Sequence, residues 1–332
     1  MEKSSSSKLI SFYNSPNKKN WSGRIPESGL RNQYWHQLIQ TQDLNKYQFD
    51  NSKKNICLLG YACDEGVRRN LGRVGAVEAP EKIRQRLAKL PWHFDKNIRV
   101  TDIGDFRCKN KNMESTQQQL GDGVFQLLQK KTFPILLGGG HDIAFGHFLG
   151  IHKWMKTTHK KKLSIINFDA HFDLRKVYKA PNSGTPFYQI CELLKKEKRD
   201  FDYTVIGIQK QSNTQELFDF AKKNKVNYYL SEDVVLKNSA YLKKELKKKI
   251  KDTEALYITI DIDCFSSIYA QGVSAPSPFG LDPMIVLDML QFLVQTKKVV
   301  SLDFAEFNPK YDSHQLTEHL VARMIDKIID FL

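Results

Sequence analysis

The sequence predicts an α/β protein of three layers, in which a mostly parallel central sheet carries helices on both faces. Two observations lead to this prediction. From residue 55 onward, short apolar runs rich in β-branched residues alternate with longer segments of helical periodicity. No internal repeat and no linker interrupts this alternation. It is typical of strands joined by crossover helices, and 332 residues are enough to bury a large core.

Apolar, β-branched runs mark the predicted strands. Residues 163–166 read Leu-Ser-Ile-Ile, and residues 256–260 read Leu-Tyr-Ile-Thr-Ile. Residues of this kind are enriched in strands because their side chains pack well on a pleated surface. We expect strands near residues 55–60, 97–102, 134–138, 163–168, 203–208, 226–230, 256–262 and 298–304.

Helical patterns fall between most of these runs. Pro80 and Pro283 stand near the starts of two of them, where proline is tolerated because the first N–H groups of a helix have no partner within it. We expect helices near residues 79–89, 115–130, 142–155, 187–196, 214–223, 238–251 and 283–295, and a last helix from about residue 313 to the end.

The first 50 residues differ from the rest of the chain. Residues 1–50 are polar with scattered aromatic side chains, and we expect an N-terminal extension to one large domain of residues 51–332. Residues 1–7 lack the apolar core of a secretory signal, and no apolar run approaches the roughly 18 residues that span a membrane. Five scattered cysteines without a Cys-x-x-Cys pair suit a reducing compartment. We therefore expect a cytoplasmic protein without a membrane partner.

The net charge of +14 raises the question of a nucleic-acid partner. Much of the lysine stands in short runs such as residues 247–249, on the expected helix 238–251 whose apolar residues recur every four positions. Such lysines are most simply the solvated face of that helix. No Arg-Gly repeat, zinc-finger spacing or RNA-binding signature accompanies them. The sequence therefore predicts no nucleic-acid partner, although a basic surface would attract an anionic substrate.

Two acidic clusters follow predicted strands. Asp169, His171 and Asp173 come after the run at 163–168, and Asp261 and Asp263 end the run at 256–262. Side chains two residues apart on a strand share a face, so we expect each cluster to point one way. Four carboxylates and an imidazole packed without a cation would repel one another at a cost of several kcal/mol.

A third segment adds a second imidazole. Residues 137–142 read Leu-Gly-Gly-Gly-His-Asp, and they place His141 after another strand-like run. A lone Asp-x-His is usually a turn or a helix cap, but here three pieces follow three strands. Ligands of open α/β sheets bind at the carboxyl ends of the strands, where all three pieces would meet. Two divalent cations would balance the four carboxylates. The glycines lack the Lys-Ser/Thr ending of a phosphate loop, so we expect no nucleotide site.

Gly-Gly-His at 139–141, Asp-Ala-His-Phe-Asp at 169–173 and Asp-Ile-Asp at 261–263 together resemble the ureohydrolase family of arginases, agmatinases and formimidoylglutamases, over roughly residues 55–330. The resemblance implies an arginase-like fold, a ureohydrolase catalytic domain and two Mn²⁺ ions per chain. Oxygen-rich ligands with some imidazole suit Mn²⁺. By the family pattern, one ion takes His141, Asp169, Asp173 and Asp261, and the other takes Asp169, His171, Asp261 and Asp263.

The finer pattern is most similar to formimidoylglutamase. The stretches that carry this likeness are residues 62–76, 167–175, 183–187 and 273–276. Agmatinases usually carry histidine before the Gly-Thr-Pro-Phe motif, and arginases carry one nearby. Here Ser183 precedes that motif, and no histidine occurs between His171 and His314. This departure argues against arginase or agmatinase activity, because a guanidinium substrate would lose its usual histidine partner.

The resemblance also points to residues that would bind an anionic amino-acid substrate. Arg175 stands where the family contacts the tail of its substrate, and a guanidinium fork suits the carboxylates of a glutamate tail. Alternatively, Arg175 pairs with a nearby acid. Ser183 is a second candidate. Arg69, with Arg68 and Arg73, is expected on a loop before the helix at 79–89, either for substrate carboxylates or for contacts between subunits. Whether the chain forms a homo-oligomer is left open.

By this resemblance the chain is a dimanganese hydrolase that converts N-formimidoyl-L-glutamate and water to L-glutamate and formamide, in histidine degradation. A hydroxide that bridges the metals would attack the formimidoyl carbon. Asp173 would accept its proton and pass it to the leaving amine. Glu306 matches the family's acidic residue that meets the amidine-like group, or else is a helix-start carboxylate.

Two other functions stay open from the sequence. One is a different ureohydrolase, acting on agmatine, arginine or a guanidino acid. The other is a non-catalytic, metal-stabilised basic module that binds nucleic acid or protein, although pure binding needs no bridging hydroxide. Three further residues are expected to have no catalytic role: Cys264 in the core, and His147 and His152 as packing or surface residues.

Overall fold

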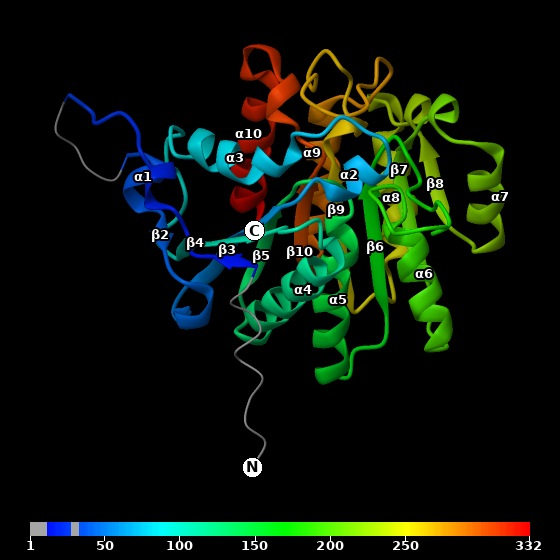
Figure 1. The fold of residues 1–332 in the computed structure, drawn as a ribbon, viewed down its shortest axis with the longest axis horizontal. Helices are drawn as coiled ribbons and strands as arrows, with labels where there is room; N and C mark the ends of the chain where they lie inside the picture. The colour runs from blue at the N-terminus through cyan, green and yellow to red at the C-terminus, as the bar shows by residue number, and fades with distance from the viewer. Residues whose placement is uncertain (1–11, 28–32) are drawn as a thin grey trace.

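The computed structural model describes residues 12–27 and 33–332, and these residues build one ten-stranded sheet (Figure 1). The strand order is β1-β4-β3-β5-β10-β9-β6-β7-β8, and β2 also pairs with β4. Every pair is parallel except β1 with β4, which is antiparallel. The predicted fold class is therefore confirmed.

All eight predicted strands are present, with bounds shifted by a few residues at most. Two very short strands near the N-terminus were not predicted. The strands are β1 Tyr13–Asn14, β2 Gln40–Thr41, β3 Lys54–Ala62, β4 Ile98–Arg107, β5 Phe133–Leu137, β6 Leu163–Phe168, β7 Asp202–Ile208, β8 Asn227–Leu230, β9 Ala255–Asp261 and β10 Val299–Ala305.

The eight predicted helices are also present, and Pro80 and Pro283 lie in the first turns of α3 and α9 as expected. The sequence missed two short helices. One of them, α2, contains Arg68 and Arg69, so the prediction that these arginines lie on a loop is wrong. The helices are α1 Trp35–Leu38, α2 Glu65–Arg69, α3 Ala79–Leu87, α4 Met113–Gln129, α5 Ile143–Thr157, α6 Pro186–Lys196, α7 Gln215–Lys223, α8 Ser239–Lys249, α9 Pro283–Gln295 and α10 Leu316–Phe331.

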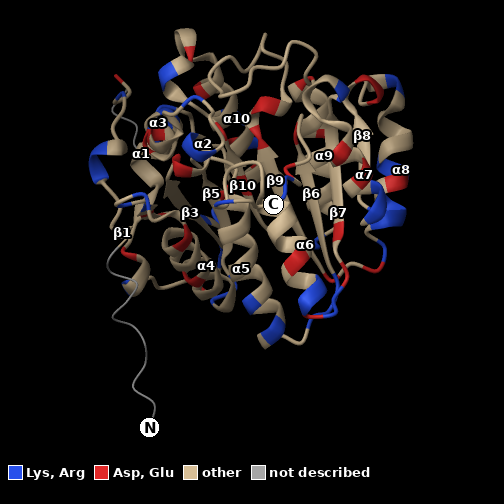
Figure 2. Cartoon of the chain, turned by 45° about the vertical axis from the view of Figure 1, so that its right-hand side comes forward, with Lys and Arg blue, Asp and Glu red and all other residues tan. Residues whose placement is uncertain are grey.

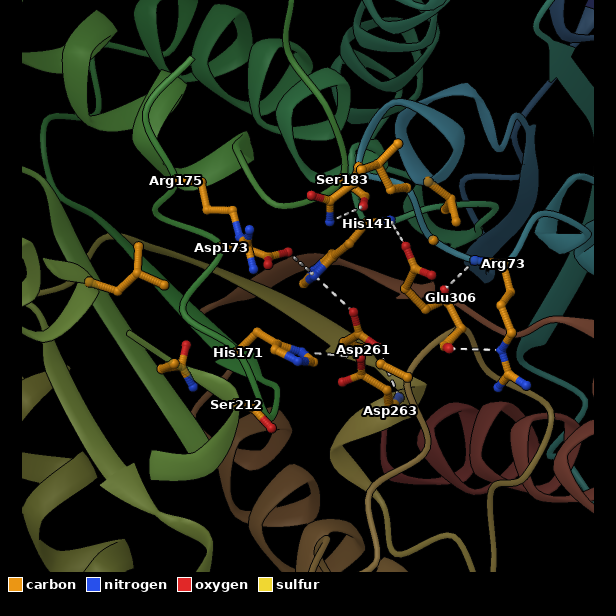
Figure 3. Close-up of a pocket in the computed structure, with 18 residues that line it drawn as sticks. Arg73, His141, His171, Asp173, Arg175, Ser183, Ser212, Asp261, Asp263 and Glu306 are labelled. Carbon is orange, nitrogen blue, oxygen red and sulfur yellow. Dashed lines mark hydrogen bonds and ion pairs between the residues drawn. The ribbon is translucent and has the colours of Figure 1, made fainter. Parts of the chain in front are cut away.

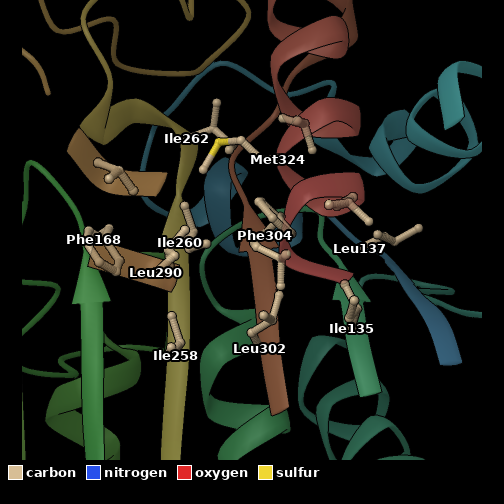
Figure 4. Packing of buried hydrophobic residues seen from close by; sticks show 14 of the residues in the cluster. Ile135, Leu137, Phe168, Ile258, Ile260, Ile262, Leu290, Leu302, Phe304 and Met324 are labelled. Carbon is tan, nitrogen blue, oxygen red and sulfur yellow. The ribbon is translucent and has the colours of Figure 1, made fainter. Parts of the chain in front are cut away.

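Helices cover both faces of the sheet and bury two apolar layers. On one face, α3, α8, α9 and α10 pack on alternate residues of the central strands, among them Ile258 and Leu302 (Figure 4). On the other face, α4, α5, α6 and α7 pack on the residues in between. Alternation follows from the two-residue period of a strand. Cys264 is fully buried in the first layer, which confirms the prediction that it packs in the core.

The described part of the N-terminal extension belongs to the same sheet and core. Strands β1 and β2 both pair with β4. Trp21 donates from Nε1 to Asp102, and Trp35 donates to Asp326 of α10. A domain boundary near residue 50 stays a prediction. The expectation for residues 1–7 concerns residues outside those described.

Charged side chains lie over the surface, and lysines gather on α8 (Figure 2). There Lys247, Lys248 and Lys249 are exposed, whereas Leu242 and Leu246 are buried, which confirms that this lysine run is the solvated side of the helix. Within residues 12–27 and 33–332, none of the helices combines the length and the apolar character needed to cross a bilayer.

Candidate metal centre

Four neighbouring strands deliver the candidate site residues to one edge of the sheet. In the order β5-β10-β9-β6, His141 lies shortly after β5, Glu306 directly after β10, Asp261 at the end of β9 and Asp169 directly after β6. The carboxyl ends of parallel strands meet at the same edge, which is where ligands of such folds bind. The structure therefore brings together residues that are up to 165 positions apart in the chain.

The prediction that the residues of each acidic cluster converge because they share a strand face is wrong. Strand β6 ends at Phe168, so the residues that follow it lie in a loop and share no strand face. The side chains converge because of short turns. The Asp169 carboxylate accepts the N–H of His171 at 2.7 Å, and the Asp261 carboxylate accepts the N–H of Asp263 at 2.8 Å. Aspartate side chains commonly close such turns by bonding the backbone two residues on.

One group of candidate ligands meets at Nδ1 of His141, and Figure 3 shows Asp173 and Asp261 beside this ring. Nδ1 of His141 lies 3.1 Å from an oxygen of Asp169, 2.9 Å from Asp173 and 3.1 Å from Asp261. This nitrogen is buried, and no hydrogen-bond partner of suitable geometry faces it within the described chain. A nitrogen without a hydrogen-bond partner, surrounded by carboxylate oxygens, fits a metal ligand.

A second group shares Asp169. Nδ1 of His171 lies 3.5 Å from Asp169 and 3.2 Å from Asp263. One oxygen of Asp263 is likewise buried without a hydrogen-bond partner in the described part of the chain. The candidate ligand atoms lie within 4.8 Å of one another in each group. Asp169 therefore stands between two sets of donors, whereas a bridging role for Asp261 stays a prediction.

The electrostatics of these groups favour added positive charge. Burial opposes a charge on His141, yet three carboxylates raise its pKa well above 6.5. Burial, together with Asp263, raises the pKa of Asp261 well above its ordinary range. Both shifts arise because carboxylates crowded in a buried space attract positive charge strongly. The donor set of carboxylates and two imidazoles fits two divalent cations, and its composition suits Mn²⁺.

Glu306 lies beside the same cluster and lines the same cavity. Its Oε1 accepts the backbone N–H of His141 at 2.8 Å, and its own N–H donates to Gly139 at 2.8 Å. Burial raises the pKa of Glu306 to about 8. Glu306 and Asp173 both have left-handed backbones, with φ of 64° and 50°. Such strained residues are frequently found at functional sites.

The cavity over the cluster holds about 290 Å³. Arg175 lines it, is exposed, and has no ion pair or side-chain hydrogen bond recorded among the described residues. Ser183 also lines it, and its hydroxyl accepts a hydrogen bond from Asn70 at 3.2 Å. Ser212 and Asn213, which the sequence did not single out, complete the polar wall on that side.

The side chains of Arg69 and Arg73, two further candidates for substrate binding, form contacts within the protein. Arg69 binds Glu65 and Glu114 and the carbonyl of Pro181, and it is not among the residues that line the cavity. Arg73 lines the cavity, but its guanidinium donates to the carbonyls of Val273 and Ser274 and lies over the ring of Tyr311. These contacts engage both guanidinium groups within the protein, and a substrate-binding role for Arg69 stays a prediction.

Sequence reasoning missed the residues beneath the cluster. Nε2 of His141 is 2.9 Å from the hydroxyl of Thr259, which donates to Asp303. Thr259 and Asp303 are polar residues in mostly apolar, buried strands. That pattern in the sequence could have indicated a buried polar contact. His147 and His152 are both buried, as expected of packing residues, and each lies within hydrogen-bond distance of a carboxylate.

Comparison with known proteins agrees with the fold. The sequence model of the Arginase family matches residues 54–330. A formimidoylglutamase of Clostridium tetani is 38% identical over 323 residues, which cover 96% of each chain. Two solved structures share the fold at lower identity. Formimidoylglutamase from Bacillus subtilis has a TM-score of 0.74 at 23% identity and covers 87% of this chain and 91% of its own. Trypanosoma cruzi formiminoglutamase with Mn²⁺ has a TM-score of 0.73 at 24% identity, with coverage of 86% and 95%. The chain belongs to the Arginase family.

Proposed function

We propose that this chain hydrolyses N-formimidoyl-L-glutamate to L-glutamate and formamide, with two Mn²⁺ ions as cofactors. Hydrolysis of a C–N bond in a linear amidine is the activity of its formimidoylglutamase relatives. The observation that carries the choice of substrate is Arg175, which lines the cavity over the ligand cluster and whose guanidinium makes no ion pair with the described residues. Arginine binds carboxylates in a bidentate manner, which suits a glutamate tail.

The ligand assignment follows the two groups of donors. His141, Asp169, Asp173 and Asp261 would hold one ion, and Asp169, His171 and Asp263, with Asp261, would hold the other. When bound, two such ions supply a water activated as a nucleophile at neutral pH and polarise the bond to be cleaved. The protein fixes the positions of the donors through the short turns at 169–171 and 261–263.

The remaining chemistry belongs to Asp173 and Glu306. Asp173 lies on the cavity wall beside His141 and would accept a proton released by the attacking water, then pass it to the leaving glutamate nitrogen. Glu306 keeps one oxygen on the backbone of His141, which leaves the other for the nitrogens of the formimidoyl group. Cleavage of the C–N bond to the protonated amine then yields glutamate, and the formimidoyl carbon leaves as formamide.

Ser183 supports the same choice of substrate. Its hydroxyl occupies the position before the Gly-Thr-Pro-Phe motif and is held by Asn70 at the cavity wall. The Ser183 hydroxyl can hydrogen-bond to a carboxylate or an amide of a substrate. It does not provide the carboxylate or imidazole group that would pair with a guanidinium. We propose that the substrate is a free anionic amino acid in the cytoplasm, and that neither nucleic acid nor a membrane takes part.

A substrate panel assayed with Mn²⁺ tests the proposal. The values of kcat/KM for formimidoylglutamate, agmatine and arginine are compared at one pH and one metal concentration. We expect formimidoylglutamate to exceed the other two by at least about 100-fold, which corresponds to roughly 3 kcal/mol of transition-state binding. A preference for agmatine or arginine would overturn the assignment of substrate but not the metal centre.

A further inference from the structure

A chain of buried polar side chains lies beneath His141, on the side of the ring that faces away from the carboxylates. Tyr257 and Thr259 share a face of β9, and Ser301 and Asp303 share the same face of β10, where they are direct partners in the sheet. His147 of α5 packs over these strands, with its ring 4.5 Å from that of Tyr257. All five side chains are fully buried.

Hydrogen bonds join these side chains into one path. Thr259 lies 2.9 Å from Nε2 of His141 and donates at 2.6 Å to one oxygen of Asp303. The other oxygen of Asp303 accepts from Tyr257 at 2.6 Å and lies 2.6 Å from Nδ1 of His147. Nε2 of His147 lies 2.6 Å from the hydroxyl of Ser301, which donates to the carbonyl of Pro134 at 2.8 Å.

The direction of each hydrogen bond follows from counting protons. Thr259 has one hydroxyl proton, and it goes to Asp303, so the bond between Thr259 and His141 must be donated by Nε2–H of His141. A neutral imidazole with its proton on Nε2 has a lone pair on Nδ1. That lone pair lies among Asp169, Asp173 and Asp261. The path therefore selects the tautomer of His141 that a metal requires.

The same count applied to Ser301 gives the direction of its hydrogen bond with His147. Ser301 donates its only hydroxyl proton to Pro134, so Nε2 of His147 donates to Ser301. Nδ1 of His147 faces Asp303 at 2.6 Å and shares a proton with it. His147 therefore satisfies the buried carboxyl group on which Thr259 depends. An unpaired carboxylate at this depth would be costly.

We propose that Thr259, Asp303 and His147 are positioning residues that hold His141 in the tautomer and orientation needed to bind the cation of the first ligand group. This inference rests on the metal centre proposed above. Partners that orient a metal-ligating histidine through its other nitrogen typically change metal affinity or activity by roughly 10–100-fold when removed. The expected effect is local, because His141 is not a ligand of the ion held by His171 and Asp263. The two ions would share only Asp169 and Asp261.

The test measures Mn²⁺ binding by equilibrium dialysis, with an electron paramagnetic resonance spectrum of each loaded protein. Thr259→Val removes the hydroxyl at nearly constant shape, and Thr259→Ser restores it. His147→Gln removes the imidazole from the far end of the path. His152→Gln is the matched control, because His152 is a buried histidine of the same helix that bonds a carboxylate, Glu197, outside the path.

We expect Thr259→Val to bind one Mn²⁺ as tightly as the unaltered protein and the other roughly 10–100-fold more weakly. Its spectrum at limiting metal should be that of an isolated ion rather than a coupled pair. His147→Gln should show the same selective loss to a smaller degree, while Thr259→Ser and His152→Gln bind both ions normally. If Thr259→Val does not fold, the Mn²⁺ affinities of His147→Gln and His152→Gln are compared instead, and a loss confined to His147→Gln supports the inference.

Two results would overturn the inference. One is normal affinity for both ions in Thr259→Val and His147→Gln, with only a lower melting temperature, which would make the path purely structural. The other is loss of the ion at His171 before the ion at His141. If the unaltered chain binds no Mn²⁺ at all, the proposed function fails, and this inference fails with it.

Discussion

Glu306 and His141 are joined through the backbone: the N–H of His141 donates to Oε1 of Glu306 at 2.8 Å, and the N–H of Glu306 donates to Gly139. The end of β10 therefore fixes the loop that follows β5. One carboxylate oxygen has a structural task, and the other is free for a substrate in the same cavity. The two tasks can be separated by substitution.

Glu306→Gln should lose activity and keep its metals. The amide oxygen can still accept the N–H of His141, so the loop stays in place, but the second carboxyl oxygen, which would meet the formimidoyl nitrogens, is replaced by an NH₂ group that cannot accept a hydrogen bond. We expect kcat/KM to fall by roughly 100-fold or more, in the range seen when one electrostatic contact to a transition state is removed. Glu306→Ala should also reduce Mn²⁺ affinity, because the His141 loop loses its anchor. Equal loss of Mn²⁺ from Glu306→Gln and Glu306→Ala would contradict these separate roles of the two Glu306 oxygens.

Substitution of single ligands tests the two groups of donors. Asp263→Ala removes a ligand of one group only, so we expect a folded protein with one tightly bound Mn²⁺ and little activity. Asp261→Ala removes a carboxylate that contacts His141 and that we propose to bridge both ions, so the metal loss should be larger. Metal analysis of purified protein decides between them. Full activity with two ions per chain in Asp263→Ala would end the dimetal proposal.

The contrast between predicted and missed features has a physical basis. The strand that ends at Phe168 and the helix that begins at Pro283 were predictable because buried parallel strands and helix starts leave strong local signals. The six candidate ligands were found because clustered carboxylates after strands are costly without a cation. Asp303 and His147 were missed because their pairing depends on the register of β9 with β10 and on the packing of α5, which no local pattern contains.

The N-terminal segment illustrates the same limit. Residues 12–27 and 33–50 contain scattered aromatic and aliphatic side chains among polar residues, which gave no periodicity to interpret. In the structure, Trp21 and Trp35 stack with ring centroids 6.4 Å apart and are buried in the layer that also contains α3 and α10. Such long-range packing overrides local polarity. The short helix α2 was missed for a related reason, because its start at Glu65 has no side-chain cap.

Acid should weaken the ion pairs within α2. Hydrogen bonds from Arg68, and then from Arg69, hold the pKa of Glu65 below its ordinary value of 4.5. A carboxylate with a lowered folded-state pKa adds stability above its unfolded pKa, and that stability is lost as the pH falls through the folded value. Glu65→Gln should therefore be less stable than the unaltered protein by about 1–2 kcal/mol at pH 7, and the difference should shrink below pH 4.5.

Urea unfolding of both proteins at several pH values checks this prediction. Glu78→Gln provides the control, because Glu78 is an exposed carboxylate nearby in the chain. At pH 7 its stability should be close to that of the unaltered protein, because a substitution of an exposed side chain usually has a small effect. A difference for Glu65→Gln that grows as the pH falls would have the wrong sign and would reject the proposed role of the Glu65 carboxylate.

Arg175 provides the sharpest test of the substrate. If its guanidinium binds a glutamate carboxylate, Arg175→Ala should weaken the transition-state complex by roughly 2–5 kcal/mol, as other truncations of charge pairs do. Metal content and melting temperature should not change, because Arg175 is not a ligand and has no recorded ion pair in the described chain to lose. Arg175→Lys should recover only part of the loss, since lysine keeps the charge but not the planar fork.

The matched control for this variant is Lys176→Ala. Lys176 is the next residue, carries the same charge and is exposed, but it does not line the cavity over the metal ligands. If Arg175 acted only by attracting anions to a basic surface, both variants would lose the same modest amount, and added salt would remove the difference. A loss in kcat/KM confined to Arg175→Ala and largely resistant to salt supports direct contact with the substrate. A near-normal Arg175→Ala enzyme would show that the carboxylate tail is held elsewhere on the cavity wall, where Asn70, Ser183 and Ser212 are among the other polar residues.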